Sequence, residues 1–373
     1  MAGYKILDNG IYFAEIDGTK GYFEIGRQNG EIFSVLIKDN VKVMRSIYGE
    51  AVGQERLDEI LEEMLQSQYI DDLKEFMPGL YDEMRGIAEG SGITLKESFM
   101  LNYLEEVPNA VIGEASGKCT AASVINRKSL PNMLFQNMDF TDAYEGFQVL
   151  YKINYDDMSI LMYGFVGQFG GIGVNSKGVG VTINVVGNIA ANEGKGIPST
   201  AITRGILEQD SIENCTEFLN ALPISTGGSY CVTDPKSAVC FEASANHIEV
   251  IKAKDDKYVI HSNHAIQSPD LVDVPGQFDG MKAIPGKDGN SIFMTCERYE
   301  LAEKLVKENH ESLDPQKAMG ILATRPILLH CNLGAGIESN TLQSVINICS
   351  DENPGIYVAK GRREDRDYVY LAF

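Results

Sequence analysis

The 373-residue chain has no tryptophan, only five histidines, and seven cysteines among which there is no Cys-x-x-Cys pair. An odd and modest number of cysteines argues against a disulfide framework, and the missing pairs argue against a structural zinc site. His261 and His264 lie three residues apart, but no His-Glu-x-x-His sequence surrounds them. We therefore expect neither a metal nor a cofactor.

Basic residues are also scarce, with 32 Lys and Arg against 53 Asp and Glu and a formal net charge of −21. Nucleic acids and anionic membrane surfaces are bound by clustered Lys and Arg, so we expect neither as a partner. No apolar run approaches the roughly 18–20 residues that span a bilayer. The first residues, MAGYKILDNGIYFAEIDG, lack a basic region followed by an apolar stretch. We therefore expect no signal peptide and a cytoplasmic protein.

The first third of the chain is predicted to be helical after a β start. We expect short strands and turns over residues 1–50. Apolar residues at three- and four-residue spacing predict one helix over 55–77 and another over about 80–90. Thr94–Glu97 has the spacing of a capping box and begins a third helix. The small and polar residues over 108–118 predict an exposed loop.

The rest of the chain is predicted to contain runs of strands separated by helices. The strand candidates are CTAASVI, MLFQNMDF, FQVLYKIN, SILMYGF, GVGVTINVV, SYCVTD, AVCFEAS, HIEVIKA, KYVIHSN, SVINICS, GIYVAKG and YVYLAF. Helices are predicted at about 198–209, 212–221, 297–309 and 315–323. This order indicates an α+β layered fold rather than strict β-α-β alternation. Because no short internal repeat is visible, we expect a single domain over residues 1–373.

The glycine-rich segment GGIGVNSKGVG could suggest a phosphate-binding loop. It matches neither the G-x-G-x-x-G pattern nor the P-loop pattern, which requires Gly-Lys-Ser/Thr in sequence. A hairpin turn around Asn175–Gly178 explains the glycines better.

Most of the cysteines fit a structural role. Five lie in helical or apolar contexts and are predicted to be buried small hydrophobes: Cys215, Cys231, Cys240, Cys331 and Cys349. Cys119 differs, because it follows a loop of small residues and opens a predicted strand. It is therefore the candidate nucleophile.

An ordered set of motifs surrounds this cysteine. Cys119-Thr120 is followed further along by Gln136-Asn137-Met138-Asp139-Phe140. MRGIAEGSGITLKESFMLN lies upstream, and GFVGQFGGIGVNSKGVGVTINVVGN, STGGSYCVTD, VCFEAS and HSNHA follow downstream. From about Gly21 to the C-terminus, the chain resembles the acyl-CoA:6-aminopenicillanate (isopenicillin-N) acyltransferase-like family, the C45 autoproteolytic group of N-terminal nucleophile (Ntn) hydrolases.

The resemblance implies a fold and a processing event. The implied fold is α+β, a four-layer αββα sandwich of two antiparallel sheets between helical layers. The implied event is self-cleavage between Lys118 and Cys119 by an N-to-S acyl shift, which divides the precursor (zymogen) into residues 1–118 and residues 119–373. We expect the two pieces to stay associated, because neither could bury its strands and helices alone. The sequence leaves the oligomeric state open, a homo-oligomer included.

Cleavage would give Cys119 both a thiol and an α-amine. Their unperturbed pKa values are about 8.5 and about 7.7–8.0, so the amine can take the thiol proton near neutral pH without a histidine. The thiolate would attack an acyl carbon, and water or an amine would resolve the thioester. The resemblance implies a small-molecule substrate, either a linear non-peptide amide or an acyl thioester such as acyl-CoA. Hydrolysis and acyl transfer both remain open.

The resemblance also implies three further catalytic residues. Asn263 would donate its side-chain amide to the oxyanion of the tetrahedral intermediate. Asp139 would orient the Cys119 amine or hydrogen-bond the end of its strand, and Arg298 resembles an arginine that opens a helix near the site. The chain departs from the family pattern at Lys118, where glycine is usual, and at Ser262, where threonine is commoner.

Other interpretations of these residues stay open. Asp139 could be a turn or helix-capping carboxylate, Asn263 could satisfy backbone groups in a loop, and Arg298 could be a solvated or salt-bridged side chain. For the whole protein, one alternative is an uncleaved precursor or inactive relative with a binding or structural role. The other is a thiol amidase that works uncut, with Cys119 deprotonated by a side chain.

Overall fold

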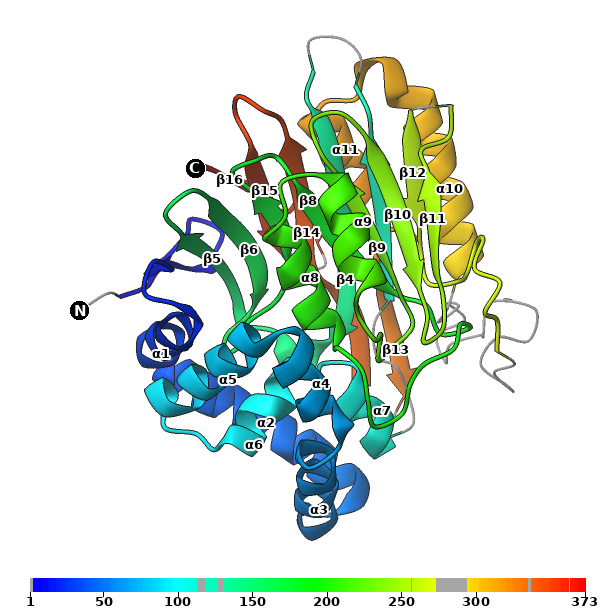
Figure 1. Cartoon of the computed structure of the whole chain (residues 1–373). Helices are drawn as coiled ribbons and strands as arrows, with labels where there is room; N and C mark the ends of the chain where they lie inside the picture. Colours follow the sequence, from blue (N-terminus) through cyan, green and yellow to red (C-terminus); the bar gives the residue numbers. More distant parts are fainter. Residues whose placement is uncertain are drawn as a thin grey trace.

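The computed structural model describes residues 3–112, 118–126, 130–255, 257–272, 294–334, 337–361 and 363–373. Two β-sheets face each other, and helices cover the outer face of each (Figure 1). This arrangement confirms the predicted α+β sandwich.

The larger sheet has nine strands within the described residues and includes β1 near the start of the chain. Its order is β1 (Lys5–Ile6), β2 (Tyr12–Asp17), β5 (Gln148–Asn154), β6 (Ser159–Phe165), β7 (Ile172–Asn175), β8 (Gly180–Val185), β9 (Gly228–Thr233), β10 (Ala238–Ala243) and β11 (Ile248–Lys252). Neighbouring strands are antiparallel except β2 and β5, which are parallel. The N-terminal segment therefore adds the edge strands of this sheet. The predicted hairpin turn is confirmed between β7 and β8, where Gly178 has φ +82° and donates to Asn175 O at 3.0 Å.

The smaller sheet has seven strands among the described residues and contains the candidate nucleophile. Its order is β12 (Tyr258–His261), β3 (Lys118–Val124), β4 (Asn132–Thr141), β14 (Ile337–Cys349), β15 (Gly355–Lys360) and β16 (Val369–Ala372), with β13 (His330–Gly334) also paired to β14. All these pairs are antiparallel. Lys118 and Cys119 open β3 and lie opposite Asp139 and Met138 of β4.

Side chains from both sheets pack into the space between them. Ala121 and Val259 of the smaller sheet contact the same apolar cluster as Cys231 and Cys240 of the larger one. Helices α8 (Ser199–Leu207) and α9 (Ile212–Asn220) lie over the larger sheet, and α10 (Thr295–Asn309) and α11 (Pro315–Leu322) pack on the smaller one. Burial of these apolar faces is the main force that holds the four layers together.

The N-terminal helices pack at one end of the sandwich (Figure 1). They are α1 (Tyr22–Ile32), α2 (Ser34–Val52), α3 (Gln54–Leu65), α4 (Gln68–Phe76), α5 (Pro78–Ser91), α6 (Leu95–Asn102) and α7 (Glu106–Ile112). The described residues also contain two short 3₁₀-helices, η1 (Asp142–Tyr144) and η3 (His310–Ser312). The predicted capping box is confirmed, because Thr94 Oγ1 accepts from Glu97 N and the Glu97 side chain accepts from Thr94 N.

The prediction for residues 1–50 was wrong after β2, because α1 and α2 occupy residues 22–52. The glycines that suggested turns instead allow two helices to touch. A Cβ on Gly26 of α1 would lie 2.0 Å from Glu83 O of α5, and a Cβ on Gly86 would lie 2.1 Å from Phe23 O. Only glycine permits backbones to approach this closely.

Two helix boundaries also differ from the prediction. The helix expected over 55–77 is two helices, and Ser67 Oγ caps the second by accepting from Tyr69 N. The loop expected over 108–118 is helical as far as Ile112, where α7 ends, and its last residue, Lys118, opens β3. Its remaining part, residues 113–117, lies outside the described residues.

Candidate active site

Cys119 is buried, with 3% of its surface exposed, and both of its main-chain polar groups are held by side chains. Its N–H donates to Asn263 Oδ1 at 2.9 Å, and its carbonyl oxygen accepts from Arg298 Nη1. The fold therefore brings three of the sequence-predicted residues into direct contact from separate segments: a strand, a loop and a helix.

Asn263 lies in the loop that follows β12 and is nearly fully buried. Its Oδ1 accepts from Cys119 N and from Arg298 Nη2, the latter at 2.7 Å, while its Nδ2 donates to Val185 O at 2.9 Å. The side chain thus serves as an acceptor toward Cys119. Its expected role as an oxyanion donor stays a prediction, since Nδ2 donates here to a main-chain carbonyl.

Arg298 lies in the first turn of α10 and is 1% exposed. Its guanidinium donates to Cys119 O, to Thr120 Oγ1 at 2.8 Å and to Asn263 Oδ1. Arginine suits this position because its planar fork of donors can bind several oxygens at once. The guanidinium charge is therefore fixed beside Cys119 and is not solvated.

Asp139 is fully buried on β4, directly opposite Lys118 across the strand pair. Thr341 of β14 donates from Oγ1 to Asp139 Oδ1 at 2.5 Å. The Asp139 carboxylate is thus placed beside the first residues of β3, Lys118 and Cys119.

Burial, and after it the negative charge of Asp139, raises the pKa of the Cys119 thiol well above its usual range. The positive charge of Arg298 acts in the opposite direction but is the smaller effect. In the intact chain the thiol is therefore protonated at neutral pH and is a weak nucleophile.

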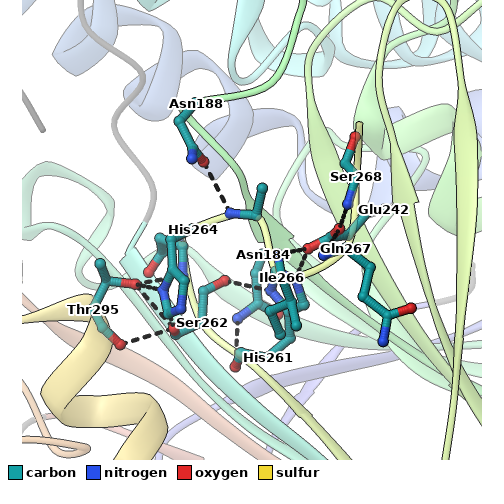
Figure 2. A network of polar contacts seen from close by, with 12 residues as sticks. Asn184, Asn188, Glu242, His261, Ser262, His264, Ile266, Gln267, Ser268 and Thr295 are labelled. Carbon is teal, nitrogen blue, oxygen red and sulfur yellow. Dashed lines mark hydrogen bonds and ion pairs between the residues drawn. The ribbon is translucent and has the colours of Figure 1, made fainter. Parts of the chain in front are cut away.

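A buried carboxylate organises the loop that carries Asn263 (Figure 2). Oε1 of Glu242 on β10 accepts from His261 Nε2 at 2.8 Å and from the main-chain N of Ile266, while its Oε2 accepts from the N–H groups of Gln267 at 2.9 Å and Ser268 at 2.6 Å. Glu242 and His261 have no exposed surface. Burial opposes ionisation of Glu242, yet the hydrogen bond from His261 and the other donors lower its pKa. The carboxylate is therefore a charged anchor for this loop.

The same loop is tied to the start of α10. Thr295 Oγ1 accepts from Asn263 N at 2.8 Å. Ser262 Oγ donates to Thr295 O at 2.9 Å (Figure 2). His264 Nδ1 lies 2.9 Å from Thr295 Oγ1. Because Arg298 is on the helix that Thr295 begins, these contacts hold Asn263 and Arg298 in register with each other.

The two histidines that the sequence analysis considered have protein partners: His261 pairs with Glu242, and His264 contacts Thr295. The part of the chain that the structure describes contains no group of three or more His, Cys, Asp or Glu side chains suited to a metal ion.

A cavity adjoins Cys119 between the two sheets, with about 480 Å³ of space not filled by protein atoms, part of it open to solvent. Most of the residues that line the cavity are apolar or glycine: Leu104, Met138, Phe140, Tyr163, Gly164, Phe165, Gly170, Gly171, Ile172, Ile183 and Val185. The polar residues of the lining are Glu105, Gln168, Ser199, Thr200, Thr203 and Gln343. Such a lining suits an apolar chain attached to the Cys119 sulfur.

Sequence reasoning missed several residues that hold the site, above all Thr295, Thr341 and Glu242. Glu242 lies in the VCFEAS block, so its family context was visible while its role was not. The threonines gave no signal, because their partners lie 32 to 202 residues away in sequence. The prediction for the other cysteines is confirmed where the structure describes them: Cys215, Cys231, Cys240 and Cys349 are buried. The Cys331 side chain lies outside the described part.

Comparison with known proteins gives the class. Residues 125–318 match the family model of acyl-coenzyme A:6-aminopenicillanic acid acyl-transferase, a match that begins shortly after Cys119 and includes Asp139, Asn263 and Arg298. The match spans more than half of the chain, which therefore belongs to this family, as predicted. The class that the family's description names is that of acyl-transferring enzymes.

Two solved structures are similar at low identity. One is the C2A mutant of conjugated bile acid hydrolase from Clostridium perfringens, with 14% identity and a TM-score of 0.46 over 68% of this chain and 96% of that one. The other is penicillin V acylase from Agrobacterium tumefaciens, with 9% identity and a TM-score of 0.45 over 68% of this chain and 86% of that one.

Within the described residues, none of the helices combines the length and the apolar character needed to cross a membrane.

Proposed function

We propose that this protein is an autoproteolytic N-terminal-cysteine enzyme that cleaves or transfers the acyl group of a linear non-peptide amide through a thioester on Cys119. The observation that carries the proposal is the hydrogen bond from Cys119 N to Asn263 Oδ1. That nitrogen belongs to the bond between Lys118 and Cys119. The same acceptor would hold the α-amine after the bond is cut.

The cleavage step balances without a cofactor. The Cys119 sulfur attacks the carbonyl carbon of Lys118, the carbon–nitrogen bond breaks, and the thiol proton goes to the nitrogen. A thioester joins Lys118 to the Cys119 sulfur until water hydrolyses it to the Lys118 carboxylate and a free thiol. Arg298, bound to Cys119 O, would keep the residue in place through these steps.

The mature enzyme would use the new amine as its base. The amine takes the thiol proton, the thiolate attacks the substrate carbonyl carbon, and the leaving amine departs with that proton. Water then completes hydrolysis, or a second amine completes transfer. Such a base is needed because burial and Asp139 raise the pKa of the Cys119 thiol and keep it protonated.

Contacts between residues 1–118 and the rest of the chain support continued association after cleavage. β2 pairs with β5, and Phe169 N donates to Asn102 Oδ1 at 2.8 Å. Arg204 of α8 and Glu83 of α5 form an ion pair at 3.2 Å with almost no exposed surface. These contacts are of the kind that holds a single domain together.

Intact mass under denaturing conditions tests the proposal, with the Cys119→Ala variant beside the wild type. We expect two wild-type fragments split between Lys118 and Cys119, and an uncut Cys119→Ala chain. Cys215→Ala, which removes a buried cysteine of α9, is the matched control and should cleave normally.

Turnover of N-acyl amides, and of acyl thioesters with an amine acceptor, should follow cleavage and be absent in Cys119→Ala. An uncut wild type that turns over amides would favour the thiol amidase that needs no cleavage. An uncut and inert wild type would favour a binding or structural role.

A further inference from the structure

Three cavity-lining residues form a row across neighbouring strands. Cys119 of β3 lies opposite Met138 of β4, and Met138 lies opposite Gln343 of β14. Residues directly opposite in adjacent strands project from the same face of the sheet, and strands are about 4.8 Å apart. Gln343 therefore lies two strand spacings, roughly 10 Å, from the nucleophile along the cavity wall.

Gln343 uses only one end of its side-chain amide. It is fully buried, and Nε2 donates to Gly164 O at 2.9 Å, which fixes the orientation because Oε1 would repel that carbonyl. Among the residues that the structure describes, none donates a hydrogen bond to Gln343 Oε1. An unpaired buried acceptor costs free energy, so this atom favours a partner that brings a donor.

A second glutamine in the same cavity shows the contrast. Gln168 Oε1 accepts from Phe165 N at 3.1 Å, and its Nε2 donates to Leu101 O at 3.2 Å. Both ends of that amide are used by the fold. Gln168 is therefore explained by structure alone, whereas Gln343 has an acceptor left for a ligand.

We propose that Gln343 is a specificity residue that accepts a hydrogen bond from a donor group, a hydroxyl or an amide N–H, carried by the acyl chain bound to Cys119. This inference rests on the proposed function, since it takes the cavity as the acyl site. The chain between the carbonyl and the donor crosses Met138 and is apolar. An unbranched chain ending in a methyl group leaves Gln343 Oε1 unpaired and binds more weakly.

The test uses matched pairs of N-acyl p-nitroanilides, one ω-hydroxyalkanoyl and one n-alkanoyl of equal atom count, over a series of chain lengths. For the length that reaches Gln343, we expect kcat/KM of the wild type to favour the hydroxyl partner by about tenfold or more. In Gln343→Met, a variant of similar shape, the preference should disappear. A wild type that favours the methyl-ended chains at every length overturns the inference, whether or not the variant folds.

Asn347→Leu is the matched control. Asn347 lies on the same strand and the same face, is fully buried, and has an amide without a hydrogen-bond partner among the described residues, but it does not line the cavity. This variant should keep the hydroxyl preference, and loss of the preference here would contradict the assignment to Gln343. Turnover without a hydroxyl preference contradicts only the inference. Absence of any turnover and of any acylated Cys119 contradicts the proposed function itself.

Discussion

The side-chain oxygen of Asn263 lies 2.9 Å from the main-chain nitrogen of Cys119, although 144 residues separate the two in sequence. The contact aligns the start of β3, where Cys119 lies, with the loop after β12. It depends on the loop geometry that Glu242 and Thr295 impose.

Replacing Asn263 with alanine should slow self-cleavage by roughly tenfold or more, because the buried Cys119 N–H and part of the Arg298 guanidinium lose their acceptor. A time course of intact mass after rapid purification measures the rate. Asn263→Asp keeps an acceptor oxygen and should cleave faster than Asn263→Ala. The exposed amide of Asn246 supplies a control, Asn246→Ala. Equal rates for Asn263→Ala and the wild type would show that the contact is not needed.

The rate of alkylation of Cys119 in the uncut chain should be low at pH 7 and should still increase with pH above pH 9. Burial and the charge of Asp139 hold the pKa of this thiol high, so the reactive thiolate is scarce until the solution is strongly basic. Iodoacetamide labelling followed by digestion at glutamate separates the uncut peptide from the peptide that begins at Cys119. Labelling that levels off below pH 8 in the uncut peptide would contradict the assigned environment.

Glu242→Gln should lower the free energy of unfolding by about 1–3 kcal/mol, because a main-chain N–H of the 262–268 loop loses its acceptor. Self-cleavage should slow as well, since Asn263 lies in this loop. Glu249 offers the matched control: its carboxylate pairs with His247 at 3.1 Å on the surface. Glu249→Gln should change stability by less than about 1 kcal/mol. A Glu242→Gln variant that loses stability but cleaves at the normal rate would limit Glu242 to a structural role.

Gly26→Ala should destabilise the protein by about 1–3 kcal/mol or more, because the new methyl group would overlap Glu83 O. A methyl group on Gly320 of α11 would meet no neighbouring atom of the described residues within 4 Å, so Gly320→Ala should stabilise by up to about 1 kcal/mol. Urea unfolding in the Cys119→Ala background, which keeps the chain in one piece, measures both. If Gly26→Ala left the free energy of unfolding unchanged, α1 and α5 could move apart without any loss of stability.

Sequence reasoning succeeded where the signal was local. The Thr94–Glu97 capping box and the existence of strand β4 could both be predicted, because each depends on residues that are neighbours in sequence. The helices at residues 22–52 were missed because Gly26 and Gly30 were interpreted as residues that interrupt a helix. These two glycines instead allow close contact with α5, which lies some sixty residues later in the sequence.

The residues of the candidate site also differ in how far local sequence could predict their positions. Cys119 and Asp139 belong to one hairpin, β3 and β4, and their proximity follows from its register. The approach of Arg298 to Cys119 O could be anticipated only through the family resemblance. Glu242 and Thr341 act through backbone or side-chain partners that only the folded chain brings near, so no pattern along the sequence indicates the role of either residue.

The parallel pairing of β2 with β5 has a consequence for the cut protein. Before cleavage, the first strands and the rest of the larger sheet form by a unimolecular reaction that does not depend on dilution. If the chain is cut as proposed, the same pairing becomes an encounter between two molecules. A denatured sample of the mature form would therefore recover activity in proportion to its concentration, whereas the Cys119→Ala chain would refold equally well at any dilution.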